Sequence, residues 1–276
     1  MIDLSKIENK ARQDGLDVRI VFKEYLHFVI LNFFFEKGFF NEIVFQGGTA
    51  LRFAYQGVRY SQDLDFVFKR KNKGYFDKLP VFLEILPDYL KRWFLKFESF
   101  KIKLQKKSSD FQRYILLAES DSLTIKDKTQ IEFAFVPSYE WQVLILKKES
   151  IPLEPAVAIE TPREILSDKV VALGAREYLK GRDLWDIYFL TTTLKVDFDR
   201  KIIKMVEKKI YDYNLNKNKF KRRIKDTVST LEEKGKEALK REMVRFLPRS
   251  YRIIFENRYS EILKICEGIL NRIISS

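Results

Sequence analysis

The sequence is poor in the residues that mark several protein classes. It has one cysteine, Cys266, among 276 residues, so neither an internal disulfide nor a cysteine-based zinc cluster can form. With 10 glycines, 7 prolines and 46% hydrophobic residues, collagen-like and disordered chains are excluded and a folded core is expected. The chain opens without a signal-peptide pattern, and its longest apolar run, residues 28–35, is interrupted by Asn32 and too short to span a bilayer. We therefore expect a soluble cytoplasmic protein with no membrane partner.

Histidine is almost absent as well. His27, the only one, lies in an apolar helical pattern, so we expect it to be packed in the core, and histidine-dependent mechanisms lose support. Cys266 lies in a second apolar helical pattern and is interpreted in the same way. A cluster of phenylalanines is also interpreted as core rather than as a surface for stacking bases, namely Phe33, Phe34, Phe35, Phe39 and Phe40.

Positive charge is plentiful and unevenly distributed. The chain has 52 basic and 39 acidic side chains, a net charge of +13, and residues 200–276 hold 21 of the basic ones against 10 acidic ones. Such a surplus suits a polyanionic partner, and we take as candidate RNA-binding residues Lys219, Lys221, Arg222 and Arg223. Solvated lysine-rich helices are an equally good explanation from charge alone. The stretch 217–225 is also a candidate for a partly mobile loop.

The order of the local patterns predicts an α+β protein in two parts. An apolar helix over 17–37 precedes a short strand at 43–45, a tight turn at 46–49 and a helix over 50–55. Period-two alternation predicts a strand at 63–68; residues 75–97 are helical in pattern, and 98–106, 111–119 and 129–136 are strand candidates. From Pro162 onward the patterns are helical. We expect a core domain over 1–155 that contains strands and helices, and a mainly helical domain with a basic surface over 156–276.

Three polar features in the first part have compatible chemistry. Gly47 and Gly48 would let a phosphate approach the backbone at the start of a helix, whose N–H groups and dipole favour an anion. Asp63 and Asp65 fall on one face of their predicted strand, where their oxygens could share a hard divalent cation such as Mg²⁺ that also binds phosphate oxygens. Glu132, on a later strand, would be a third ligand or a base. Together these features predict a magnesium site that holds a triphosphate.

Two sequence blocks resemble the signature of the minimal nucleotidyltransferases of the polymerase-β-like superfamily. They are Gly47-Gly48-Thr49-Ala50-Leu51 and Arg59-Tyr60-Ser61-Gln62-Asp63-Leu64-Asp65-Phe66. The pattern is most similar to the AbiEii/AbiGii family of abortive-infection toxins, which also carries an Asp-Lys-x-x-Ala-Leu helix and an Arg-Asp-x-x-Asp helix. Here these correspond to residues 168–173 and 182–186, with Arg176 between them. Gln62 and Glu132 depart modestly, since relatives often have Glu and Asp there.

The resemblance implies a nucleotide-binding domain with a mixed β-sheet flanked by helices, a helical C-terminal domain, Mg²⁺ and the transfer of a nucleotide from an NTP. It assigns Asp63 and Asp65 to the metal, Lys169 to the triphosphate, and Asp186 with Asp183 to assisting the attacking group. Candidate nucleotide-binding residues are then Gly47, Gly48, Thr49, Ser61, Lys169, Arg176 and Arg182. Without the resemblance, Arg182 and Asp186 would be interpreted as an exposed pair of oppositely charged residues one helical turn apart.

Three functions remain open from the sequence. The first is a toxin of a toxin–antitoxin, phage-defence system that transfers a nucleotide to RNA, with the tRNA 3′ end as one candidate acceptor and an antitoxin encoded nearby as a partner; a protein or small molecule could also be the acceptor. The second is a catalytically idle module that binds a nucleotide or RNA. The third is a phosphotransferase that uses the γ-phosphate, since similar metal geometry serves either phosphorus atom.

Overall fold

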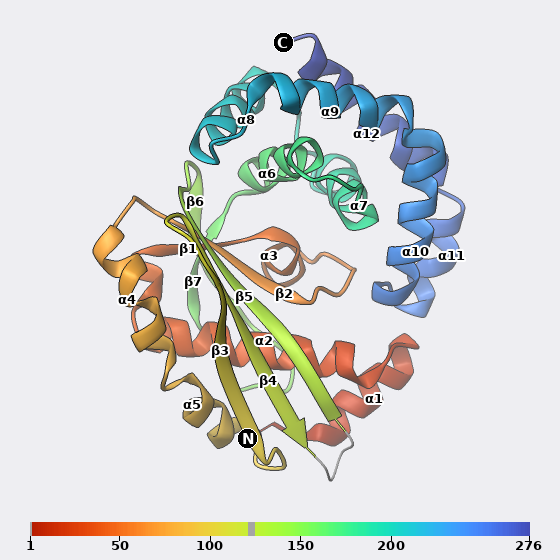
Figure 1. Ribbon diagram of the computed structural model, residues 1–276. Coiled ribbons are helices and arrows are strands. Elements are labelled where there is room, and N and C mark those ends of the chain that lie inside the picture. Colours follow the sequence, from red (N-terminus) through yellow and green to blue (C-terminus); the bar gives the residue numbers. More distant parts are fainter. Residues whose placement is uncertain (1, 121–124) are drawn as a thin grey trace. The chain divides into compact units, whose positions relative to one another are not determined.

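The computed structural model describes residues 2–120 and 125–276, which form two compact units (Figure 1). Unit 1 comprises residues 1–54 and 60–159, apart from the undescribed positions, and unit 2 comprises residues 55–59 and 160–276. The chain thus leaves unit 1 for five residues, between the glycine turn and the Asp-x-Asp strand, and returns. In the described part of the chain, no helix is both long enough and apolar enough to cross a bilayer.

A seven-stranded mixed sheet forms the centre of unit 1, with strand order β3-β4-β5-β2-β1-β7-β6. Its strands are β1 (Ile43–Gln46), β2 (Asp63–Phe68), β3 (Ser99–Lys107), β4 (Phe111–Ser120), β5 (Ile125–Pro137), β6 (Trp141–Ile145) and β7 (Ala156–Glu160), the last residue of which belongs to unit 2. β1 is antiparallel to β2 and parallel to β7, while β2 is parallel to β5. The expectation of a mixed sheet is therefore confirmed, but β6 and β7 were not predicted.

Helices flank this sheet as expected. They are α1 (Leu4–Asp14), α2 (Val18–Glu36), α3 (Gly47–Ala54), α4 (Lys73–Leu83) and α5 (Leu86–Trp93), with a 3₁₀ turn at Phe39–Asn41. α2 is apolar on all sides and almost wholly buried, which is typical of a central core helix. The ring of Phe34 stacks on Phe39 with centroids 4.5 Å apart, so the core interpretation of this cluster is confirmed. Phe35 is the exception, with 43% of its surface exposed.

His27 is completely buried in α2, as its apolar surroundings predicted. Its Nε2 atom lies 2.6 Å from Oγ1 of Thr129 on β5, which ties the helix to the sheet. Burial, reinforced by the positive charge of Lys23, lowers the pKa of His27 to about 3. The imidazole is therefore neutral at physiological pH and serves packing.

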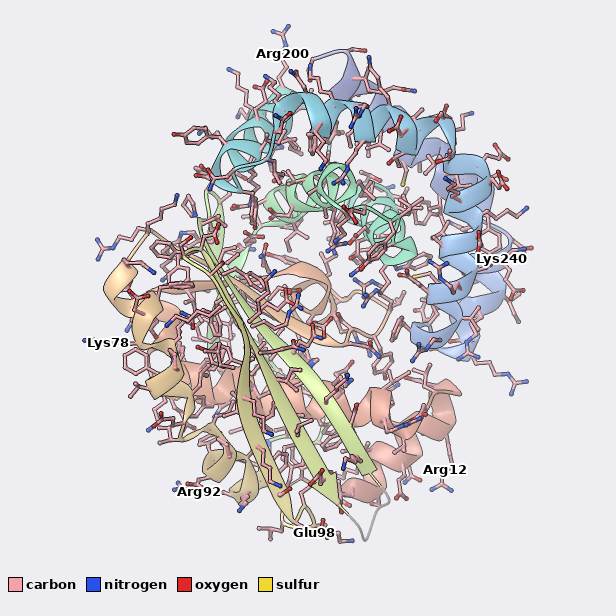
Figure 2. All side chains as sticks on the ribbon, viewed as in Figure 1. Arg12, Lys78, Arg92, Glu98, Arg200 and Lys240 are labelled. Carbon is pink, nitrogen blue, oxygen red and sulfur yellow. The ribbon has the colours of Figure 1, made fainter. Side chains whose placement is uncertain are left out.

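Unit 2 is helical. It contains α6 (Pro162–Ala175), α7 (Gly181–Tyr188), α8 (Arg200–Asp212), α9 (Lys217–Ser229), α10 (Lys236–Phe246), α11 (Arg249–Glu256) and α12 (Tyr259–Ile274), with π-helical turns at Phe189–Thr193 and Leu231–Gly235. Cys266 is buried on α12, as expected. The stretch 217–225 is ordered as α9, capped by the side chain of Asn216, so the loop interpretation was wrong. Many cations of this unit are exposed, including Arg200 and Lys240 (Figure 2).

Candidate active site

The glycine turn passes directly from strand to helix. β1 ends at Gln46 and α3 begins at Gly47, three residues earlier than expected. Gly47 has φ +81°, a left-handed conformation that glycine adopts without strain. A Cβ atom built on Gly47 would lie 2.7 Å from Oδ2 of Asp65, so only glycine leaves room for this carboxylate. The Asp65 side chain therefore faces the turn.

The carboxylates of unit 1 share one face of two neighbouring parallel strands. On β2, Asp63 and Asp65 are half-buried and alternate with Leu64 and Phe66, which are completely buried. On β5, Glu132 is the register partner of Asp65. Paired residues of adjacent strands point to the same side of the sheet, so these three side chains gather on one face. This arrangement supplies the carboxylate oxygens that Mg²⁺ prefers.

Glu132 has a partner of its own. Nε of Arg113, on β4, lies 2.7 Å from Oε1 of Glu132, and both side chains are only partly exposed. A carboxylate held in this way binds a metal ion only with its remaining oxygen or after exchange of its partner. Glu132 thus lies beside Asp65 on the same face of the sheet and also forms an ion pair with Arg113.

Thr49 and Ser61 have different surroundings. Thr49 is buried, and its hydroxyl donates a hydrogen bond of 2.5 Å to the backbone carbonyl of Asp63, which fixes the start of β2 to α3. A nucleotide could therefore contact Thr49 only through the N–H groups of the first helical turn, which have no acceptor within the helix. Ser61 is half-buried in the segment that leads into β2.

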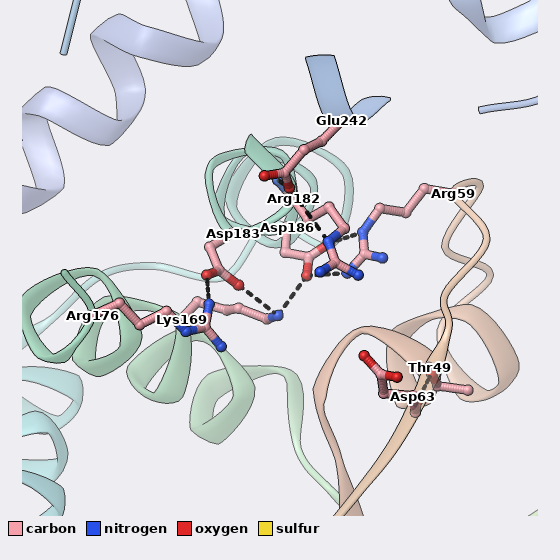
Figure 3. A network of polar contacts seen from close by, with 9 residues as sticks. All are labelled: Thr49, Arg59, Asp63, Lys169, Arg176, Arg182, Asp183, Asp186 and Glu242. Carbon is pink, nitrogen blue, oxygen red and sulfur yellow. Dashed lines mark hydrogen bonds and ion pairs between the residues drawn. The ribbon is translucent and has the colours of Figure 1, made fainter. Parts of the chain in front are cut away.

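A second polar cluster lies in unit 2 and brings together the two later motifs (Figure 3). Nζ of Lys169, on α6, lies 3.1 Å from Oδ1 of Asp183 and 2.7 Å from Oδ2 of Asp186, both on α7. Arg59 binds Asp186 through two hydrogen bonds of 2.6 Å, one from Nε and one from Nη2. Arg176 forms an ion pair with Asp183. Three cations thus surround two carboxylates, which leaves one excess positive charge in a largely buried cluster.

The chain is similar to a family of known proteins. The profile of the family described as "Nucleotidyl transferase AbiEii toxin, Type IV TA system" matches residues 30–263. The chain belongs to the AbiEii family. The resemblance stated from the motifs is therefore confirmed, and the match extends through most of the basic C-terminal region.

Solved structures from Helicobacter pylori share the fold of this AbiEii-family chain. One, JHP933, superposes with a TM-score of 0.55 at 16% identity and covers 94% of this chain and 95% of its own. Another, described as a putative nucleotidyltransferase, has a TM-score of 0.52 at 17% identity and covers 94% of this chain and 96% of its own. No curated protein matches the sequence. At these identities the two structures establish the α+β fold.

Arg182 of the AbiEii motif is not the partner of Asp186. Its Nε lies 3.4 Å from Oε2 of Glu242, on α10, and its backbone N–H donates to the same oxygen at 3.3 Å. The pairing of Arg182 with Asp186, expected in the absence of the resemblance, was therefore wrong. Asp186 is instead neutralised by Arg59 and Lys169, which lie far from it in sequence.

The ion pairs of unit 2 change the proton affinity of both aspartates. Burial alone would raise the pKa of Asp183, but the charges of Lys169 and Arg176 outweigh it and lower the pKa to about 2. The same competition lowers the pKa of Asp186, where Arg59 and Lys169 outweigh burial. Lys169 responds in the opposite direction, and its pKa is raised by Asp186 and Asp183 despite burial. All three groups are therefore charged at neutral pH.

We expect this cluster to make the protein sensitive to acid. A carboxylate whose pKa is lowered on folding contributes stability above its unfolded value, near 3.8 for Asp183, and loses that contribution as the pH falls toward 2. The free energy of unfolding should thus fall by on the order of 2 kcal/mol between pH 5 and pH 2 from Asp183 alone. Urea unfolding, followed by the fluorescence of tryptophans such as the buried Trp185 on α7, measures it. In Asp183→Asn the pH dependence should shrink by that amount; an unchanged slope would contradict the assignment.

The close approach at Gly47 gives a second prediction. In Gly47→Ala the new methyl group meets Oδ2 of Asp65 at 2.7 Å and the residue must keep a left-handed φ. We expect a loss of roughly 1–2 kcal/mol in stability and at least about a tenfold loss in nucleotide transfer, because Asp65 must turn away from the turn. The matched control is Gly74→Ala in α4, whose new Cβ would make an ordinary contact of 3.7 Å; it should leave transfer unchanged and raise stability by up to about 1 kcal/mol, because alanine favours the helix. Equal behaviour of the two variants would contradict this geometry.

The structure also shows a buried ionic cluster in unit 2 that the sequence did not indicate. Nζ of Lys209, on α8, lies 2.7 Å from Asp168, 2.8 Å from Glu164 and 3.5 Å from Glu160. Oxygens of the three carboxylates lie within 4.8 Å of one another, a spacing that would suit a cation, and the ammonium group of Lys209 supplies that charge. Asp168, which precedes Lys169 in the family motif, thus serves this cluster and not the pair of aspartates on α7. Helical spacing could have signalled the burial, since Lys209 continues the apolar stripe of Ile202, Met205 and Val206.

The candidate RNA-binding residues all lie on α9, but they differ in burial and in their contacts. Arg223 is partly buried and donates a hydrogen bond to the backbone carbonyl of Ala175 at the end of α6. Lys219 and Arg222 are exposed, and Lys221 is half-exposed. The helix therefore uses Arg223 to hold α6 and leaves the other cations accessible.

Proposed function

We propose that this AbiEii-family protein transfers a nucleotidyl group from an NTP to an acceptor hydroxyl with the help of Mg²⁺, as the toxin of a type IV toxin–antitoxin system. The family is one of nucleotidyl transferase toxins; the magnesium, the NTP and the acceptor are parts of the proposal. One observation carries it: Asp63 and Asp65 lie on one face of β2, and the carboxylate of Asp65 lies against the glycine turn where α3 begins.

The residues of unit 1 fit a divalent cation. Asp63 and Asp65 would hold it through carboxylate oxygens, with Glu132 as a further candidate that remains paired with Arg113. When bound, Mg²⁺ neutralises phosphate oxygens and so makes the phosphorus atom a better electrophile. The N–H groups at the start of α3 point in the direction that favours a phosphate, and glycines 47 and 48 carry no side chain to block it.

The reaction exchanges one bond to phosphorus for another. The oxygen of the acceptor hydroxyl attacks the α-phosphorus of the NTP, the bond from that phosphorus to the bridging oxygen breaks, and pyrophosphate leaves. The hydroxyl proton passes to a base or to solvent.

Lys169 is proposed to add positive charge for the triphosphate. Asp183 and Asp186 fix its ammonium group, while Arg59 fixes Asp186 in turn. Because the pKa of Asp186 is lowered, this carboxylate is a weak proton acceptor in the arrangement observed. We therefore assign Asp183 and Asp186 the role of assisting the reaction through the position of Lys169.

RNA is the proposed acceptor, with the tRNA 3′ end as one candidate. The excess of basic residues over 200–276 supports it, because each phosphate neutralised by lysine or arginine releases counterions. Both NTP and RNA are cytoplasmic, so we place the protein there. The toxin–antitoxin family also implies a cognate antitoxin as a partner.

Position-specific labelling tests the proposal. The protein is incubated with Mg²⁺, total RNA and NTPs labelled on either the α- or the γ-phosphate, and RNA and protein fractions are then counted. Nucleotidyl transfer moves the α-label and leaves the γ-label in pyrophosphate. Transfer of the γ-label instead would show a phosphotransferase, and no transfer of either label across the four NTPs would leave a binding module.

A further inference from the structure

A polar pocket of about 630 Å³ lies wholly within unit 2. The end of α6 and the residues that follow it form one side, and the second half of α9 with the first half of α10 forms the rest. The volume falls within the range of sites that hold small organic ligands. Of its lining residues, only Arg176 and Arg223 are among the candidate site residues named above.

Cations outnumber anions around the pocket. Four basic side chains line it, Arg176, Arg223, Lys234 and Arg241, against three acidic ones, Glu177, Asp226 and Glu237. Because Arg176 and Arg241 also face Asp183 and Glu242 outside the lining, the pocket offers an anion individual guanidinium and ammonium groups and not a net positive charge.

Two of the guanidinium groups are held in place before any ligand arrives. Arg176 is paired with Asp183, and Arg223 is bound to the carbonyl of Ala175 and lies 3.5 Å from Glu177. Arg241 is looser, since it lies 3.8 Å from both Glu237 and Glu242 and 60% of its side chain is exposed. Fixed guanidinium groups lose little entropy when they bind phosphate, and a loose one can close over it.

The uncharged part of the lining suits the rest of a nucleotide. Tyr178 has 66% of its surface exposed, so the ring can stack on a base. The hydroxyl groups of Thr227, Ser229 and Thr230 supply hydrogen-bonding atoms of the kind that pair with a ribose or with base edges. Guanidinium groups, an exposed aromatic ring and hydroxyls together match phosphate, base and ribose.

We propose that this pocket binds one ribonucleotide, and, resting on the proposed function, that this ribonucleotide belongs to the unpaired strand of the RNA acceptor. Of the four candidate RNA-binding residues on α9, the pocket lining includes only Arg223. The specific contact with RNA therefore lies in the pocket, while Lys219, Lys221 and Arg222 contribute general electrostatic attraction. Arg176 joins the pocket to the Lys169 cluster, because it lines the former and pairs with Asp183 in the latter.

The test measures binding apart from chemistry. Fluorescence anisotropy of labelled single-stranded hexaadenylate and hexauridylate, and calorimetry with AMP and UMP, are performed on full-length Asp63→Asn protein without Mg²⁺. In this background we compare Lys234→Glu/Arg241→Glu with the matched pair Lys201→Glu/Lys204→Glu, which makes the same charge change at exposed positions of α8 outside the pocket. Tyr178→Ala tests the stacking surface, and circular dichroism confirms that each variant is folded.

We expect the pocket pair to weaken oligonucleotide binding at least about tenfold and to reduce its salt slope by roughly one, whereas the matched pair weakens it no more than about threefold. Tyr178→Ala should weaken binding about tenfold, with the salt slope unchanged. A third result is possible: AMP or UMP binds, the pocket pair abolishes that binding, and oligonucleotide binding does not depend on the pocket. The pocket is then a nucleotide site, but its ligand is a free nucleotide and not part of an RNA strand. Equal effects of the two charge pairs, or no binding of any probe at millimolar concentration, would overturn the proposal.

The same proteins separate this inference from the proposed function. If oligonucleotide binding depends on the pocket but the wild-type protein transfers no label, the pocket inference is supported and the proposed nucleotidyltransferase activity is contradicted. Label transfer by the wild-type protein, with RNA binding indifferent to Lys234, Arg241 and Tyr178, would do the reverse.

Discussion

Asp63→Asn is expected to reduce nucleotide transfer by at least about a thousandfold, because one charge and one strong oxygen ligand are lost from the proposed metal site. Asn keeps the shape of Asp, and the backbone carbonyl of residue 63 still accepts the hydrogen bond from Thr49, so the fold should persist. Measurement of α-label transfer gives the rate. Titration with Mn²⁺, followed by electron paramagnetic resonance, gives the metal affinity, which should fall in parallel.

Asp77→Asn is the matched control for this prediction. Asp77 also belongs to unit 1, but it lies on the exposed face of α4, where it pairs with Lys73 one turn away. Removal of such a pair costs a few tenths of a kcal/mol, so transfer and metal affinity should both remain unchanged. If Asp63→Asn retained a tenth or more of wild-type transfer, the metal site proposed for β2 would be excluded.

The features of the candidate site that could be predicted depend on neighbours in the sequence. Alternation in period two places Asp63 and Asp65 on one face of β2 opposite Leu64 and Phe66, and a strand shows this pattern wherever it lies. The turn at Gly47 is signalled in the same way, because two glycines between an apolar run and a helical pattern mark a change of direction. The position of Glu132 beside Asp65 was suggested only by the carboxylate of Glu132, because the register between strands distant in sequence does not follow from local sequence patterns.

The features that could not be predicted depend on partners far away in the chain. Arg59 belongs to the quoted motif, yet nothing near it in sequence indicates that it binds Asp186, 127 residues later. Residues adjacent in sequence also have different partners: Asp168 forms an ion pair with Lys209, whereas Lys169 forms ion pairs with the aspartates of α7. The strands β6 and β7 were missed because, unlike the equally short β1, neither is followed by a glycine turn, and both lie among proline-containing segments.

Lys209→Met is expected to destabilise the protein by about 3–5 kcal/mol, because three buried carboxyl groups lose the cation that they share. Burial together with the neighbouring charge of Asp168 already raises the pKa of Glu160 well above its usual value. Burial alone would lower the pKa of Lys209. The negative charges of the three neighbouring carboxylates outweigh burial and raise this pKa. Methionine is similar in length, so the loss should come from charge and not from a cavity.

The pH dependence distinguishes this loss from simple repacking. Without Lys209, Glu160 and its neighbours fold more easily when protonated, and acids with raised pKa values contribute less stability as the pH rises above their unfolded values, near 4.5 for Glu160. Urea unfolding should therefore show a larger difference between variant and wild-type protein at pH 8 than at pH 5. Lys208→Met, at the exposed neighbouring position, should change stability by less than about 0.5 kcal/mol at either pH. Addition of Glu164→Gln to Lys209→Met should recover part of the loss, because one fewer charge is then buried; a double variant no more stable than Lys209→Met at pH 8 would contradict an ionic role for the cluster.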